Sequence, residues 1–158
     1  MRRSDRQQDR AFSLALIDRC THGVAAFATG EDAPYCIPLS FVRVDNVLYF
    51  HCAREGRKTE LLRRDPRVCV TFVGDDSPAF EEPSDFTTFF QSAVVCGTAK
   101  EVTDEDEKIS ALRALCEKIT PEHMNRERFD LAIRHSLAVT AVWRIEMTEI
   151  TGKAKLHR

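Results

Sequence analysis

Hydrophobic positions along this chain recur at two spacings, and each spacing predicts a different kind of element. Runs rich in β-branched and aromatic residues predict six strands, over residues 23–29, 35–44, 47–53, 67–73, 86–102 and 138–145, the last extended by EMTEITGKAK. Helical spacing predicts helices over residues 9–20 and 57–64, from Thr103 as the cap to about Ile119, and from about Arg126 to His135. With no repeat and no linker, the 158 residues are expected to form a single domain.

Turn residues refine this order of elements. Asp45-Asn46 joins two β-rich runs and tolerates positive φ, which predicts a hairpin. Pro38 cannot donate to a ladder, so its strand is predicted to be bulged or at a sheet edge. Gly97 predicts a bulge or a sharp bend. Residues 74–85, GDDSPAFEEPSD, are acidic and interrupted by proline, which favours a loop excursion.

The connections between the strands decide the fold class. Few of the predicted helices lie between strands, where parallel crossovers would need them, so the strands are expected to pair antiparallel. The sequence therefore predicts an α+β domain built on an antiparallel β-barrel with peripheral helices.

Composition and charge exclude several classes of function. Hydrophobic residues make up 43% and charged residues 30% of the chain, as in soluble globular domains. A net charge of −2 gives no basic excess for nucleic acid. No apolar run has the length of a membrane span, and AFSLALIDRC predicts a helix rather than a signal peptide. We expect a cytoplasmic protein without nucleic-acid or membrane partners.

Six cysteines are spread along the chain without a C-x-x-C pair: Cys20, Cys36, Cys52, Cys69, Cys96 and Cys116. Reduced thiols are expected in an unsecreted domain of this size, several of them packed as small apolar side chains. Cys20 and His22 are close in sequence, but no further ligands stand at a recognisable spacing, so no metal site is predicted.

The segment VLYFHCAREGRKTELL, residues 47–62, has the parts of an anion-binding site. A strand leads through a turn with Gly56 into a helix whose first residues are Arg57 and Lys58. Amide N–H groups at a helix start are unpaired, and the helix dipole favours negative charge beside these two cations. A phosphate is the expected ligand, with solvated surface cations as the alternative interpretation. The segment is not a P-loop, because His51 stands where the first glycine would be.

Four ordered segments carry a resemblance to a known family: PYCIPLSFV, YFHCAREGRK, FTTFFQSAVVCGTAKEV and EITGKAK. Together they resemble the pyridoxamine 5'-phosphate oxidase-like split β-barrels, and more closely the branch that contains the nitroimidazole-resistance (Nim) proteins. The resemblance covers nearly the whole chain, from MRRSDR to GKAK. It implies a six-stranded split barrel that forms a homodimer and binds FMN in a groove at the dimer interface.

The resemblance also implies which residues hold the cofactor. Cys52, Arg57 and Lys58 match the positions that bind the FMN phosphate. Cys52 replaces a hydroxyl residue of the oxidase and is a poorer hydrogen-bond donor. Further matches to cofactor-binding positions are Pro38, Leu39 and Ser40 on the strand along which the flavin ring lies, Ser92 beside the ring or phosphate, and Phe90 at a position often occupied by tyrosine.

An FMN-dependent oxidoreductase is the function that the resemblance implies. A nicotinamide donor would reduce the flavin, and the reduced flavin would pass electrons to a small oxidised substrate, with nitro compounds as candidates. His51 matches a histidine characteristic of the Nim branch and could place a proton or hydrogen bond near the ring, the alternative being a core histidine satisfied by backbone. Pyridoxamine phosphate oxidation is not favoured, because EITGKAKLHR lacks the basic substrate motif of the oxidase.

Two alternatives stay open. One is a flavin- or haem-binding module without turnover, a sensor or carrier, whose axial ligand would be His22, His51, His123, His135 or His157. The other is a groove that takes a longer deazaflavin instead of FMN.

Overall fold

The structure is a computed structural model that describes residues 2–30 and 33–156. In these residues an eight-stranded antiparallel sheet follows the order β3-β2-β6-β7-β8-β5-β4, and β1 pairs with β8. The strands are β1 Gln7–Gln8, β2 His22–Phe27, β3 Tyr35–Ser40, β4 Val42–Val44, β5 Val47–Ala53, β6 Arg67–Glu81, β7 Asp85–Glu101 and β8 Thr140–Lys155. The helices are η1 Ser4–Arg6, α1 Arg10–Arg19, α2 Arg57–Arg64, α3 Glu105–Ile119, η2 Pro121–His123 and α4 Arg126–Ser136. None of these helices is long and apolar enough to cross a membrane.

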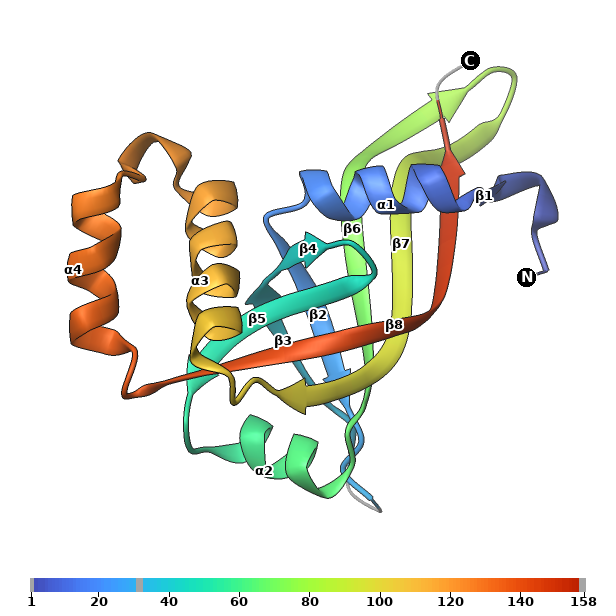
Figure 1. Cartoon of the computed structure of the whole chain (residues 1–158). Coiled ribbons are helices and arrows are strands. Elements are labelled where there is room, and N and C mark those ends of the chain that lie inside the picture. Colours follow the sequence, from blue (N-terminus) through green and yellow to red (C-terminus); the bar gives the residue numbers. More distant parts are fainter. Residues whose placement is uncertain (1, 31–32, 157–158) are drawn as a thin grey trace.

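Bent long strands give the sheet its barrel shape. β7 and β8 curve along their length, so that the sheet wraps around an apolar core (Figure 1). Leu16 of α1, Phe50 of β5 and Phe72 of β6 are among the fully buried side chains of that core. A second cluster, with Leu115 and Phe129, packs α3 and α4 beside β4 and β5. The predicted α+β domain with an antiparallel barrel and peripheral helices is confirmed.

The described residues form eight strands rather than six, for two local reasons. The predicted strand over residues 35–44 is divided at Phe41, whose buried ring packs edge-on against Phe50 and Phe72 at centroid distances of 5.6 Å. Turning that ring into the core breaks the period-2 alternation of a continuous strand. The second addition is β1, a two-residue strand that pairs with the end of β8.

Residues 74–85 form the end of a hairpin, so the predicted loop excursion is wrong. β6 continues to Glu81 and β7 begins at Asp85, with a register shift after Val73 (Figure 1). Phe80 and Phe86 face each other across this end, with ring centroids 4.9 Å apart. Such cross-strand aromatic pairs stabilise a ladder even where the local composition is polar.

Other local predictions can be compared directly. Pro38 lies on β3, which is an edge strand, and Asp45 has φ 52° in the hairpin between β4 and β5. The predicted irregularity at Gly97 is a register shift between β7 and β8. The predicted cap of α3 is wrong by one residue: Asp104, and not Thr103, is the cap, and its carboxylate accepts from the Glu107 amide at 2.8 Å.

Candidate functional site

Buried side chains stabilise the turn that leads into α2. Gly56 has φ 123°, a conformation that favours glycine, and its carbonyl accepts the hydroxyl of the buried Thr59 at 2.7 Å. Leu61 and Leu62 bury the inner face of the helix. No side chain caps the helix start, so its first amide N–H groups point outward without intrahelical partners.

Two cations extend from this uncapped start in different directions. The guanidinium carbon of Arg57 lies 5.0 Å from the ring centroid of Tyr35 on β3, a cation–π contact that links α2 to the edge strand. Lys58 is half-buried and lies toward β5, where its charge acts on both His51 and Cys52. Among the described residues, neither Arg57 nor Lys58 forms an ion pair with a carboxylate.

His51 and Cys52 are neighbours in sequence but face opposite sides of β5. Cys52 packs against the main core, and burial raises the pKa of its thiol although Lys58 opposes the shift. His51 is exposed by surface area, yet the crowding of its ring lowers its pKa, and the Lys58 charge adds to this effect. The imidazole is therefore neutral at pH 7, able both to donate and to accept a hydrogen bond.

The three residues predicted to lie along the flavin ring are consecutive on the edge strand β3. Pro38 is exposed, Leu39 packs against the main core, and Ser40 is half-buried opposite His22. Because β3 pairs only with β2 on the sheet path, one side of its backbone is left without a strand partner. β3, the end of β5 and the start of α2 thus share one side of the barrel.

Phe90 and Ser92 lie elsewhere in the chain. Ser92 pairs with Lys153 near the end of β8, whereas Cys52 pairs with Ala141 near its beginning. The Phe90 ring lies under two cations, with Lys153 at 5.6 Å and Arg6 at 5.9 Å from its centroid. Within one chain these two residues therefore lie at the opposite end of β8 from Cys52.

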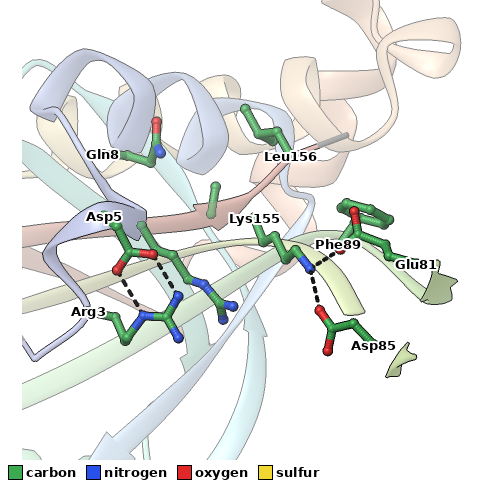
Figure 2. A pocket seen from close by; sticks show the side chains of 10 residues that line it. Arg3, Asp5, Gln8, Glu81, Asp85, Phe89, Lys155 and Leu156 are labelled. Carbon is green, nitrogen blue, oxygen red and sulfur yellow. Dashed lines mark hydrogen bonds and ion pairs between the residues drawn. The ribbon is translucent and has the colours of Figure 1, made fainter. Parts of the chain in front are cut away.

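A hollow of about 470 Å³ near Phe90 was not predicted from the sequence. Figure 2 shows the Lys155 amino group reaching toward Glu81 and Asp85, with Nζ 3.7 Å from Asp85 Oδ2. Arg3 and Asp5 pair at 2.7 Å on the other wall. These charges come from the two chain ends and the hairpin, so no local motif could have indicated that they meet.

A larger cavity of about 610 Å³ lies between α3, α4 and the start of β8. Two basic side chains bridge its rim to backbone: Lys108 donates to the Leu137 carbonyl at 2.8 Å and Arg54 to the Ala138 carbonyl at 3.0 Å. Its lining contains none of the predicted cofactor residues.

The histidines proposed as haem ligands are dispersed. His22, His123 and His135 are exposed on three different elements, and His157 lies outside the described residues. Within residues 2–30 and 33–156, no three His, Cys, Asp or Glu side chains gather as they would around a metal ion.

An antiparallel sheet wrapped around a core, with a cationic helix start beside an edge strand, defines the class of split β-barrel domains. The chain belongs to the pyridoxamine 5'-phosphate oxidase family, whose sequence pattern it matches over residues 9–154. A comparison with curated proteins gave no match.

Solved structures agree with this assignment. A candidate 5-nitroimidazole antibiotic resistance protein from Bacteroides thetaiotaomicron is 26% identical, with a TM-score of 0.78 over 92% of this chain and 84% of that one. An FAD and haem binding protein from Mycobacterium smegmatis is 20% identical, with a TM-score of 0.79 over 96% and 74% of the two chains. A NimC/NimA family protein from Clostridium acetobutylicum is 13% identical, with a TM-score of 0.59 over 92% and 85%. The predicted resemblance to this family and its Nim branch is confirmed.

Proposed function

We propose that this chain binds FMN and works as a reductase, passing electrons from a nicotinamide donor to a small oxidised substrate such as a nitro compound. The observation that carries the proposal is the start of α2, where Arg57 and Lys58 flank uncapped amide groups and have no carboxylate partner among the described residues. A phosphate dianion would receive charge-assisted hydrogen bonds from both side chains and from the helix amides.

The neighbouring residues suit the isoalloxazine end of the same ligand. Pro38, Leu39 and Ser40 would offer main-chain groups on the open side of β3 to the polar edge of the ring. His51, neutral near pH 7, would hold a hydrogen bond or move a proton beside it. Bound flavin supplies the redox chemistry, and the chain supplies binding and orientation.

A second copy of the chain completes this proposed site. Phe90 and Ser92 match flavin-side positions but lie at the far end of β8 from Cys52 within one protomer. In a homodimer with twofold symmetry, β7 of the partner subunit would lie beside the start of α2. Each flavin would then be held between two chains.

The experiment is to purify the protein, record its visible spectrum and identify the released ligand by mass. FMN is expected, with bleaching of the flavin bands when NADH or NADPH is added without oxygen. The chain is similar to an FAD and haem binding protein from Mycobacterium smegmatis, so FAD and haem are the informative alternatives to FMN as the released ligand. A Soret band would favour a haem-binding module. Protein that holds flavin but is reduced by neither nicotinamide would be a flavin carrier or sensor, and the reductase proposal would be wrong.

A pair of variants tests the phosphate corner. Charge-assisted hydrogen bonds are worth about 1.5–3 kcal/mol each, so Arg57→Ala and Lys58→Ala should each raise the Kd for FMN by roughly 10- to 100-fold. Arg64→Ala, which removes a cation from the last turn of the same helix, is the matched control and should leave the Kd within about twofold. If a variant carrying both Arg57→Ala and Lys58→Ala kept the wild-type affinity for FMN, the phosphate would have to bind elsewhere.

A further inference from the structure

Two of the six cysteines stand opposite each other in the sheet. Cys69 of β6 and Cys96 of β7 are cross-strand partners in the antiparallel ladder. Both side chains lie on the outward face of the sheet and are half-buried. They line a surface hollow of about 540 Å³ together with Arg67 and Thr98, which are exposed. Small reagents can therefore reach them from solvent.

The hydrogen-bond pattern shows which type of cross-strand pair this is. The Ala99 amide donates to the Pro66 carbonyl at 2.8 Å, so residues 66 and 99 form a hydrogen-bonded pair. Pair types alternate along an antiparallel ladder, so residues 68 and 97 are also hydrogen-bonded, whereas Cys69 and Cys96 form a non-hydrogen-bonded pair. The Cys96 carbonyl confirms this assignment, because it points toward β8 and accepts the Thr148 hydroxyl at 3.1 Å.

Non-hydrogen-bonded pairs bring the two side chains closest together. Their Cα atoms lie about 4.5 Å apart, which falls inside the span of about 4.4–6.8 Å that a disulfide bridges. Cys36 shares the same row, opposite Ala26 and therefore two strands from Cys69. Two strand spacings amount to roughly 9.6 Å, which is too far for a bridge without movement of the backbone.

We propose that Cys69 and Cys96 form a reversible dithiol–disulfide site that is oxidised by peroxide or by a low-molecular-weight disulfide. With hydrogen peroxide, one thiolate attacks an oxygen atom to give a sulfenic acid and water, and the second thiol attacks that sulfur and releases another water. Two thiols lose two electrons and two protons, and one peroxide is reduced to two waters. With a small disulfide, two successive exchanges form the bridge and release two small thiols.

Only a thiolate can start this sequence of steps, so its rate depends on pH. Burial and the neighbouring Cys96 sulfur raise the pKa of Cys69 to about 11, so little of it is thiolate near neutral pH. Oxidation should accelerate as the pH rises.

Peptide mass spectrometry of the wild-type protein tests the proposal without any substitution. Trypsin leaves both cysteines in one peptide, residues 68–100, because no lysine or arginine lies between Arg67 and Lys100. After peroxide or glutathione disulfide, this peptide should lose the mass of two hydrogens and resist alkylation, and a second cut at glutamate should leave its two parts joined. Dithiothreitol should reverse both changes.

Variants and a proximity probe complete the test. Cys69→Ser and Cys96→Ser should each abolish the linked fragment, whereas Cys36→Ser should leave it unchanged. On reduced protein, phenylarsine oxide should block both thiols together, since its arsenic bonds two neighbouring sulfurs and releases water. Residues 68–100 that remain fully alkylatable after oxidation, or that carry only links to other cysteines or other chains, would overturn the proposal.

Discussion

Gly97 of β7 lies against the backbone of β8. A Cβ atom placed on it would be 2.3 Å from the Glu146 carbonyl oxygen and 2.7 Å from the Ile145 Cγ2 atom. Backbone cannot yield as a flexible side chain does, so Gly97→Ala should lower the free energy of unfolding by about 1–3 kcal/mol, measured by urea denaturation. Thr98→Ala, at the exposed neighbouring position, is the control and should stay within about 0.5 kcal/mol of the wild type. Equal stability of the two variants would contradict this account of the bulge.

His51 gives the fold a dependence on pH with a definite sign. Its pKa in the folded chain lies below the ordinary 6.5, because burial and Lys58 disfavour the imidazolium ion. The unfolded chain therefore takes up this proton first, and the stability that neutral His51 contributes is full above pH 6.5 and is lost as the pH falls below it.

The measurement is the loss of stability between about pH 7.5 and about pH 5.5, a window set by the histidine titration. His51→Gln should lose less stability across this window than the wild type. His123→Gln, at an exposed position on η2, is the control and should behave like the wild type. A wild-type pH profile in His51→Gln would show that the imidazole is not crowded.

At the scale of elements, the sequence predicted what nearby residues determine. The β4–β5 hairpin follows from Asp45-Asn46, and α2 ends at Arg64 because Pro66 disfavours helical backbone at Asp65. Residues 74–85 were misassigned because their acidic, proline-containing composition is typical of a loop, although their strand partners, residues 85–90, follow directly in the chain. Phe80 pairs with Phe86 across the turn, and no periodicity in GDDSPAFEEPSD reveals that contact.

Lys155 should hold the end of the β6–β7 hairpin against β8. Its amino group bonds the Thr87 hydroxyl at 2.7 Å and pairs with Glu81 and Asp85. Partly exposed pairs are worth about 0.5–1 kcal/mol, so Lys155→Ala should speed amide exchange in residues 76–86 by roughly two- to fivefold, measured by hydrogen–deuterium exchange. Lys100→Ala, at an exposed position on β7, should leave that exchange unchanged. Faster exchange over the whole sheet would indicate a global effect instead.

At the scale of the whole molecule, sequence reasoning located one half of the candidate site. The strand–turn–helix segment contains His51, Cys52, Arg57 and Lys58 within eight residues, so their proximity follows from the local chain. The distance that separates Ser92 from them depends on the path of β8, which pairs with β5 over residues 140–146 and with β7 over residues 143–155. No pattern in a single strand encodes that path.

This separation predicts complementation between two defective chains. Co-expression of an Arg57→Ala/Lys58→Ala chain with a Phe90→Ala/Ser92→Ala chain, each with its own tag, would give mixed dimers. In a mixed dimer of a twofold-symmetric pair, one site combines both intact halves and the other combines both altered halves. Random pairing makes half of all dimers mixed, so about a quarter of all sites, and about half of the sites in the doubly tagged dimers, should bind FMN. Flavin content and Kd of the doubly tagged fraction measure this directly. Recovery no greater than in either variant alone would mean that each chain binds its ligand without help from a partner.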